Sequence, residues 1–440
     1  MPDTGKNIKS TRLKNGFLVT DKGLRRSDCL LLDGRIDLSG RETSARAEEK
    51  TADLAGKYVL PGFVDIHFHG LNLFDFTLGR FNPETETFDA SKSAYKKGFE
   101  MLAKTLPGFG VTGFYIATFA AGLNSLKNCY GNLAEYLKKQ QKPSGARLFG
   151  GLLEGSFISP DMAGAQDPAF VFKPSPEAFD NIEDKGTIKL ALVGPDSGEP
   201  AFKLIKYLTD KGIVVGAGHT NATYNQVADA VKAGLKYCIH FTNGPTGGSY
   251  KPFNRGGAVE AVLQLDGMYA ELIADGYHVN PAYIRDIIHR KGVEKIIGMT
   301  DCMFVAGSPL KRIKIGAVPG KVSDDGKYIA VENKKNTLFG SVLTMNRAFE
   351  NMLNWLTSEM EGIWNRRHAA LSFEEALAAV ARMYSGNPCE LAGLKAQGFG
   401  RLADGAKADI CVLDITGSSG NYKVTVDSTI VDGNVVYSRN

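Results

Sequence analysis

The chain has 440 residues, of which 43% are hydrophobic and 23% are charged, and its net charge at pH 7 is only +4. This composition is typical of a globular protein and excludes a mainly disordered or fibrous chain. The length predicts one large domain and a smaller one, because single hydrophobic cores stop growing at about 250–300 residues.

The distribution of charge, cysteine and apolar residues predicts the setting of the protein. Basic residues cluster only in short stretches such as Lys138-Lys139 and Arg366-Arg367, which we interpret as solvated helix faces. The sequence has no run of about 18 apolar residues, and its first residues lack the apolar core of a secretory signal. The six cysteines show no C-x-x-C spacing and are interpreted as reduced packing residues. We expect a cytoplasmic protein with no nucleic-acid and no membrane partner.

Both ends of the chain predict short β-strands. Residues 13–60 contain alternating stretches broken by Gly and Asp, such as GFLVT and CLLLDGRID. The last forty residues show the same short alternating stretches with Asp-Gly turns, in ADICVLD and YKVTVDSTIVDG. Because two β-rich ends enclose a different middle, we expect residues 1–59 and 396–440 to form one small discontinuous β-sandwich domain.

Residues 60–395 alternate apolar runs with amphipathic segments. The runs are YVLPGFVDIH, VTGFYIATFA, RLFGGLLEG, IKLALVG, GIVVGAGH, LKYCIHF, YAELIADG and EKIIGMTD. Segments such as AYKKGFEMLAKTL and TYNQVADAVKAG have helical spacing. Eight such units predict an α/β fold with a (β/α)8 TIM-type barrel. The alternative is an open doubly wound sheet, although no G-x-G-x-x-G opens a helix after the first run.

The pattern changes after Asp301. Residues 311–336 are polar and rich in Gly and Asp, which predicts an exposed β-hairpin inserted in a barrel loop. Helical segments around MNRAFENMLNWLTSEM and FEEALAAVARMYS then close the barrel region.

Ionisable residues follow the predicted strands. They are His67 and His69 after the first run, then Glu154, His219, His240, His278 and Asp301 at or just beyond the ends of later runs. The carboxyl ends of barrel strands converge on the face where active sites are built, so these side chains are expected to meet. Two histidines two apart on an extended segment can reach one ion, and together with a carboxylate the set suits Zn²⁺ or Fe²⁺. The alternatives are polar residues that merely end a strand and, for Glu154, a buried structural acid.

Asp301 follows IIGMT, which would hold its carboxylate at the barrel mouth. As a general base it can take a proton from the attacking water and deliver it to a leaving amine. The alternative role is a helix N-cap, which does not exclude catalysis. The adjacent Cys302 is interpreted as a packing residue rather than a nucleophile.

Eight strings of the sequence match a known family. They are PGFVDIHFHG, LLEGSFISPDMAGA, GIVVGAGHTNATY, CIHFTNG, IADGYHVNP, MTDCMFVAG, LFGSVLTMNRA and GRLADGAKADICVLD. In these strings the chain resembles the amidohydrolase superfamily, and within it the N-acetylglucosamine-6-phosphate deacetylases, along nearly its whole length. The strings AGHTNATY, EGSFISP and IADGYHV are specific for this branch, whereas PGFVDIHFHG and TDC also fit dihydroorotase-like or aminoacylase-like relatives.

The resemblance implies a metal centre with assigned ligands. It implies that Glu154, His219 and His240 bind the principal divalent metal, and that His67 and His69 supply a second site that only some members have. One or two ions per subunit are therefore expected, zinc or iron, with Glu154 as the bridge.

The resemblance also implies how a small amino sugar phosphate would be bound. His278 and the backbone at Asn243 and Gly244 would hold it. Gln166 replaces a family histidine and can still donate to a substrate carbonyl. Arg255 lies near, but out of register with, a family arginine that reaches the phosphate bound by a neighbouring subunit, so phosphate binding and a plain surface position are both open. A homodimer is implied.

The implied activity is hydrolysis of N-acetylglucosamine 6-phosphate to glucosamine 6-phosphate and acetate, by a metal-activated hydroxide with Asp301 as the base. One alternative is an amidohydrolase that acts on another N-acetylated sugar, a cyclic amide or an N-acyl amino acid. The other is a catalytically silent protein that has kept the fold.

Overall fold

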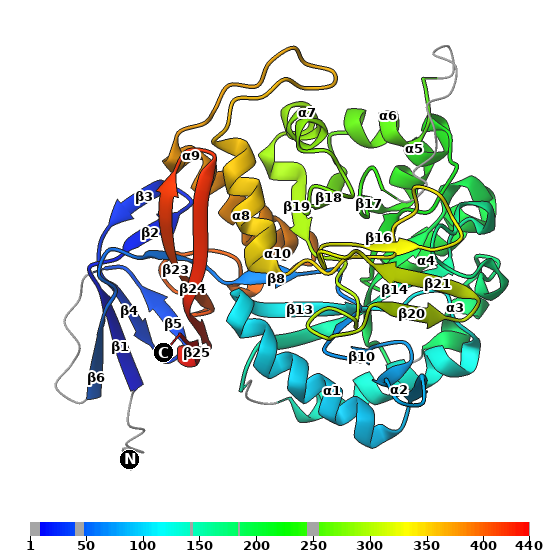
Figure 1. Ribbon diagram of the computed structural model, residues 1–440, viewed down its shortest axis with the longest axis horizontal. Helices are drawn as coiled ribbons and strands as arrows, with labels where there is room; N and C mark the ends of the chain where they lie inside the picture. Colours follow the sequence, from blue (N-terminus) through cyan, green and yellow to red (C-terminus); the bar gives the residue numbers. More distant parts are fainter. Residues whose placement is uncertain (1–8, 40–47, 141–143, 184, 244–254, 440) are drawn as a thin grey trace.

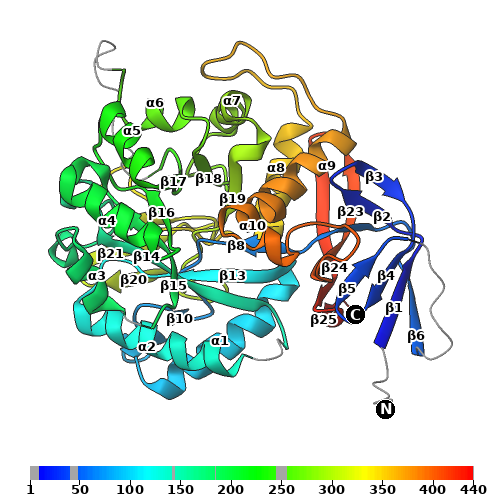
Figure 2. The same ribbon diagram turned by 180° about the vertical axis from the view of Figure 1, so that it is seen from behind.

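The computed structural model describes residues 9–39, 48–140, 144–183, 185–243 and 255–439. In this part of the chain a closed barrel of parallel strands is surrounded by helices, and a smaller β domain lies against one side of it (Figure 1 and Figure 2). The first strands, in blue, and the last strands, in red, lie side by side in both views.

The barrel contains the eight predicted runs in chain order. Its strands are β8 (Phe63–Asp65), β13 (Val111–Ala117), β14 (Arg147–Phe157), β15 (Ile188–Val193), β16 (Val214–Ala217), β17 (Leu235–Cys238), β18 (Tyr269–Ile273) and β19 (Ile296–Met299). Neighbouring strands pair in parallel. The ring closes where Asp301 N donates to His67 O at 2.9 Å and His69 N donates to Cys302 O at 3.0 Å. The predicted (β/α)8 barrel is confirmed.

Helices cover the outside of the barrel (Figure 2). They are α1 (Lys92–Thr105), α2 (Leu123–Lys139), α3 (Pro176–Ile182), α4 (Glu199–Asp210), α5 (Tyr224–Ala233), α6 (Ala258–Gln264), α7 (Pro281–Lys291), α8 (Met345–Leu356), α9 (Phe373–Ala381) and α10 (Asn387–Leu391). Local sequence fixes where several of them begin. Thr223 accepts from Gln226 N and Gln226 bonds back to Thr223 N, a capping box that starts α5.

Two apolar layers hold the barrel together. Inside it, Ile66, Tyr115, Leu152, Tyr237 and Ile297 are each no more than 2% exposed and fill the space between the strands. Between the strands and the helices lies a second and larger core. Because the barrel interior is packed, an active site is expected at one of its ends.

The small domain is built from both chain ends. One sheet has the order β25-β24-β23-β7-β2-β3 and the other the order β5-β4-β1-β6. The strands are β1 (Lys9–Lys14), β2 (Phe17–Thr20), β3 (Gly23–Arg26), β4 (Cys29–Leu32), β5 (Arg35–Asp37), β6 (Glu48–Asp53), β7 (Tyr58–Pro61), β23 (Ile410–Ser418), β24 (Asn421–Val431) and β25 (Asn434–Ser438). An apolar cluster joins residues of both sheets. The domain boundaries 1–59, 60–395 and 396–440 remain a prediction, although β7 continues the sheet of the small domain to Pro61.

The first apolar run forms two strands rather than one. β7 pairs with β23 in the small domain, and β8 pairs with β13 in the barrel, with Gly62 between them. A Cβ atom at Gly62 would meet Thr112 Cγ2 at 2.1 Å, so only glycine allows the chain to pass from one domain to the other at this point.

Two small sheets lie at the barrel mouth. One contains β9 (Gly70–Leu71), β10 (Phe74–Asp75), β11 (Gly79–Asn82) and β12 (Thr87–Asp89), and the other contains β20 (Arg312–Ile315), β21 (Val318–Val322) and β22 (Ile329–Val331). The predicted hairpin is thus present and gains a third strand. Its buried residues Ile313 and Ile329 belong to one apolar cluster with Phe81, Phe304 and Phe339, which fixes the insertion over the mouth.

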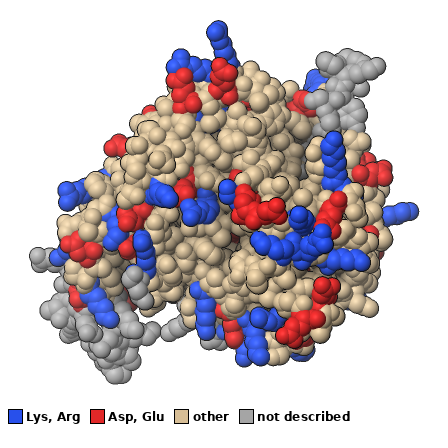
Figure 3. Space-filling model, in the orientation of Figure 1, with Lys and Arg blue, Asp and Glu red and all other residues tan. Residues whose placement is uncertain are grey.

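The surface carries both signs of charge. On the face in Figure 3, Lys and Arg side chains are interspersed with Asp and Glu, as the small net charge leads one to expect. Among the described residues, none of the helices combines the length and apolar character needed to cross a membrane.

Candidate active site

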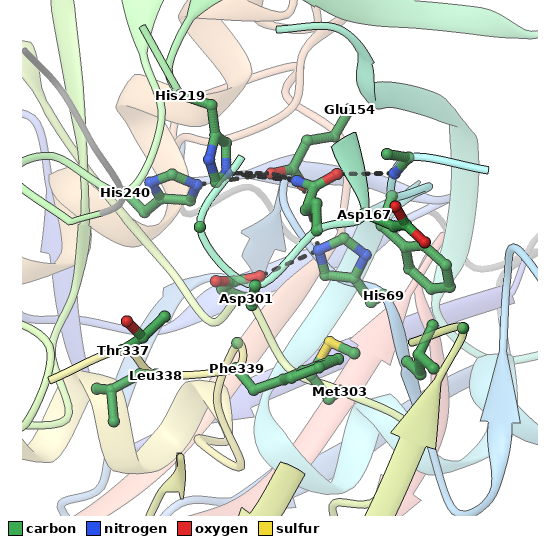
Figure 4. A pocket seen from close by; sticks show the side chains of 18 of the residues that line it. His69, Glu154, Asp167, His219, His240, Asp301, Met303, Thr337, Leu338 and Phe339 are labelled. Atoms are coloured by element: carbon green, nitrogen blue, oxygen red, sulfur yellow. Dashed lines mark hydrogen bonds and ion pairs between the residues drawn. The ribbon is translucent and has the colours of Figure 1, made fainter. Parts of the chain in front are cut away.

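Six ionisable side chains converge at the carboxyl ends of the barrel strands. They are His67, His69, Glu154, His219, His240 and Asp301, and each is no more than 7% exposed. They form two groups, His67 with His69 and Asp301, and Glu154 with His219 and His240. Within each group the possible ligand atoms lie within 4.8 Å of one another. Figure 4 shows most of this cluster at one wall of a cavity.

Glu154 joins the two groups. Its Oε2 lies 2.8 Å from His67 Nε2 and 3.2 Å from His69 Nε2. Its Oε1 lies 3.2 Å from His219 Nε2 and 3.6 Å from His240 Nε2. One carboxylate therefore faces four imidazoles, with one oxygen turned toward each group.

Asp301 approaches the first group from the end of β19, the strand that meets β8 where the ring closes. Its Oδ1 lies 3.1 Å from His69 Nε2 and 3.6 Å from His67 Nε2. Asp301, His219 and His240 each have a positive φ, of 53°, 46° and 27°. Non-glycine residues in this region cost about 1–3 kcal/mol each and are concentrated at functional sites. The backbone is thus held in unfavourable conformations at three residues of the cluster.

The rear nitrogens of two histidines are fixed by backbone carbonyls. His219 Nδ1 lies 2.9 Å from Met162 O, and His240 Nδ1 lies 2.7 Å from Asn243 O. A carbonyl oxygen can only accept, so in the neutral rings the proton is on Nδ1 and Nε2 presents a lone pair. Both rings therefore turn a lone pair toward Glu154.

This arrangement fits a divalent cation. Lone pairs of imidazole nitrogens and carboxylate oxygens repel one another unless a proton or a metal lies between them. Buried imidazoles with their rear nitrogen hydrogen-bonded, together with a carboxylate, are typical ligands of zinc and related metals. Glu154, His219 and His240 would hold one ion, and His67, His69 and Asp301 with Glu154 surround a second position.

The close approach of imidazoles and carboxylates also shifts the pKa values of the metal-free cluster. Burial opposes the charge of His69, but hydrogen bonds to Asp301 and Glu154 outweigh burial and raise the pKa of His69 to about 9. Burial likewise opposes the charge of His67, and the Glu154 carboxylate raises its pKa. For Glu154 itself burial favours the neutral acid, yet the charge of His67 holds its pKa well below the usual value.

Zinc binding is expected to tighten as the pH rises. Below about pH 9 His69 carries a proton in the metal-free protein, and a cation can bind its nitrogen only after that proton leaves. Each displaced proton changes the apparent Kd by up to about tenfold per pH unit. Zinc titrations of metal-free protein should give a Kd that falls as the pH rises from 6 to 9. A Kd constant over this range would contradict the assigned protonation.

The cavity has a volume of about 560 Å³ and an apolar side. Phe119, Met303, Ile315 and Phe339 line it, and the insertion strands bring Ile315 and the segment 336–340 over the cluster. Figure 4 shows Met303 and Phe339 on the side of Asp301 away from His219 and His240. The mouth of the barrel is therefore enclosed rather than open to solvent on this side.

The polar side of the cavity contains two of the predicted substrate residues. His278 and Asn243 both line it. Asp275 Oδ2 lies 2.6 Å from His278 Nδ1, and Asn243 Nδ2 donates to His278 O. Their assigned roles remain predictions. Gly244 lies outside the described residues.

The other two predicted substrate residues lie in different surroundings. Gln166 lines the cavity, donates to Glu154 Oε1 at 2.9 Å, and accepts from Ala120 N at 2.7 Å. Arg255 is exposed, its guanidinium lies 5.7 Å from the centroid of the Tyr224 ring, and it is not among the cavity residues. The structure thus brings Gln166 to the cluster and leaves Arg255 at the surface.

Sequence reasoning missed two acids that contact the histidines. Glu271 Oε2 lies 3.1 Å from His67 Nδ1, and Asp275 pairs with His278. The sequence does contain a signal for Glu271, which is an acid within the apolar run YAELI. A carboxylate in a buried strand needs a polar or charged partner, so its position predicts a contact of this kind. Asp275 stands in IADGYHV, a string that matched the family.

A (β/α)8 barrel with this imidazole and carboxylate cluster at its carboxyl end is typical of metal-dependent hydrolases. The model of the Amidohydrolase family matches residues 58–436. The chain therefore belongs to the amidohydrolase family.

Several proteins similar to this chain are N-acetylglucosamine-6-phosphate deacetylases. The chain is 28% identical to N-acetylglucosamine-6-phosphate deacetylase of Bacillus subtilis (strain 168) over 369 residues, 81% of this chain and 86% of that protein. It is 27% identical to the Homo sapiens enzyme of that name over 404 residues, 89% of this chain and 86% of that protein. The crystal structure of the Thermotoga maritima enzyme matches with a TM-score of 0.76 and 26% identity, over 97% of this chain and 100% of that one. The crystal structure of the Mycobacterium smegmatis enzyme matches with a TM-score of 0.77 and 24% identity, over 98% of this chain and 100% of that one. This match supports the fold.

Proposed function

We propose that this protein removes the acetyl group from N-acetylglucosamine 6-phosphate and releases glucosamine 6-phosphate and acetate. The observation that carries the proposal is the contact of Glu154 with four imidazoles, with Asp301 beside them, at the mouth of an amidohydrolase barrel. The shared name of the relatives supports the choice of substrate.

The chemistry divides between a metal and the chain. A divalent cation, when bound, polarises the amide carbonyl and lowers the pKa of the attacking water. Asp301 accepts the proton of that water and delivers it to the leaving nitrogen. In the metal-free protein burial favours the neutral form of Asp301, but the hydrogen bond from His69 lowers the pKa of Asp301. Gln166 donates from Nε2 to the carbonyl oxygen as negative charge develops there.

The sugar is held on the polar side of the cavity. His278 has its Nδ1 occupied by Asp275, which leaves Nε2 for a hydroxyl or phosphate oxygen. Asn243 is fixed next to it by its bond to His278 O. The acetyl group then lies over the cluster, between Glu154 and Asp301.

A second candidate substrate is an N-acetylated sugar without phosphate. Among the described residues that line the cavity there is no Lys or Arg. A phosphate is usually met by such a cation, most often by an arginine that binds two of its oxygens. This feature favours a neutral sugar, whereas the relatives favour the phosphate ester.

Acetate release is expected to be faster from the phosphorylated sugar. A charge-assisted hydrogen bond contributes about 1.5–3 kcal/mol, so kcat/KM should be about tenfold or more higher for N-acetylglucosamine 6-phosphate than for N-acetylglucosamine. The measurement is a coupled acetate assay over both sugars, their galactosamine analogues and an N-acetyl amino acid, with ring opening of a cyclic amide followed separately. Equal rates for the two glucosamine forms would select the second candidate, and release from the amino acid alone would contradict both.

We further propose that the metal is zinc or iron, with one or two ions per subunit. The imidazole and carboxylate ligands support this choice. We propose a homodimer, which the family resemblance supports. We also propose a cytoplasmic setting, supported by the six cysteines, which are all buried and free.

A further inference from the structure

Glu271 is a buried carboxylate that the proposed reaction does not use. It lies on β18 inside the barrel, beneath the cluster, and is 0% exposed. Its Oε2 lies 3.1 Å from His67 Nδ1, while its Oε1 has no hydrogen-bond partner among the described residues. An ionised carboxylate in an apolar strand is unfavourable unless it is paired. Its contact with His67 therefore offsets part of the cost of burying this carboxylate.

His67 is held between two carboxylates. It is 0% exposed, and its Nε2 lies 2.8 Å from Glu154 Oε2 on the cluster side, while Glu271 lies behind Nδ1. Because Glu271 accepts from Nδ1–H, the lone pair of the ring is left on Nε2, where a cation would bind. A carboxylate behind a ligating imidazole fixes the ring orientation and increases the basicity of the ligand.

The neighbouring histidine lacks this support. His69 Nδ1 is buried and has no hydrogen-bond partner among the described residues. Of the two histidines in H-F-H, His67 is thus the one held from behind. A leucine could fill the position of Glu271 without the desolvation of a charge, so space filling does not account for an acid there.

We propose that Glu271 is a positioning residue for the metal centre. It keeps His67 in the tautomer that directs Nε2 toward the cation position formed with His69 and Asp301. The inference rests on the proposed metal centre and not on the proposed substrate, so acetate release by the wild-type protein tests the latter separately.

The test measures zinc binding by metal-free protein. Equilibrium dialysis with metal analysis would compare the wild type with Glu271→Leu and Glu271→Gln. Loss of a hydrogen-bonded partner behind a ligand lowers metal affinity by about 10–100-fold. We expect that loss in Glu271→Leu for the weaker-bound ion, or for the single ion if one binds. Glu271→Gln, which keeps an acceptor oxygen, should recover most of the affinity.

A double-mutant cycle separates positioning from general support of the fold. In a His67→Ala background, Glu271→Leu should change zinc affinity by less than about twofold, because the ring that it positions is gone. Additive losses would overturn the proposal. So would an unchanged affinity in Glu271→Leu with His67 present. If Glu271→Leu does not fold, Glu271→Ala takes its place in the cycle, with a loss of about 10–100-fold expected with His67 and less than about twofold without it.

Asp409 provides the matched control. It is also buried, and it accepts from Asp432 N at 2.7 Å in the small domain, away from the cluster. Asp409→Asn should leave zinc stoichiometry and affinity unchanged. A loss of zinc in this variant equal to that of Glu271→Leu would show that removing any buried acid disturbs the site, and would overturn the proposal.

Discussion

Replacing Asp301 by asparagine is expected to lower kcat by about a thousand-fold while zinc remains bound. A positioned general acid and base contributes about 10²–10⁴-fold, and an amide cannot take a proton from water. Asparagine keeps the size of the side chain and an oxygen that can accept from His69, whose Nε2 lies 3.1 Å from Asp301 Oδ1. The measurements are kcat for acetate release and metal content per chain in the same preparation.

Two outcomes would contradict this role for Asp301. Near-normal turnover with full metal content would exclude it as the base. A loss of turnover that parallels a loss of metal would assign it to metal binding instead. Asp286→Asn is a suitable control, because Asp286 is fully buried but bonds to the segment 363–368 outside the cavity.

Replacing Glu154 by glutamine is expected to remove both the metal and the activity. Glu154 contacts all four histidines of the cluster, so loss of its charge weakens both cation positions. A catalytic cation supplies several kcal/mol of transition-state stabilisation, and 1.36 kcal/mol corresponds to tenfold in rate. We expect kcat/KM to fall by about a thousand-fold or more at ordinary zinc concentrations.

Added metal distinguishes the causes of that loss. If Glu154 acts through the cation, the activity of Glu154→Gln should rise with zinc concentration toward a plateau. Activity that stays flat while zinc binds would mean that Glu154 acts in another way. A Glu154→Gln protein with normal metal content and normal rate would exclude the proposed centre.

The barrel could be predicted from sequence because its signal is repetitive. Eight apolar runs separated by amphipathic segments give one architecture, and the position of the histidines after these runs predicts their convergence. His67, His69 and His219 illustrate this, since each follows a run and each lies in the observed cluster. The strings that resemble the family indicated the same residues.

Other features depend on contacts that no local pattern contains. The run YVLPGFVDIH looks continuous, yet Gly62 divides it between two domains because of its contact with Thr112. The partner of Glu271 is His67, 204 residues away in the sequence. The exposure of Arg255 is likewise a feature that periodicity does not predict.

The shared sheet of the small domain has a consequence for biosynthesis. β7 is synthesised long before its partner β23. Until then one edge of β7 is unpaired, and such an edge is a template for association with other chains. Premature termination before Ile410 should therefore yield a nascent product prone to aggregate, even though its barrel strands are complete.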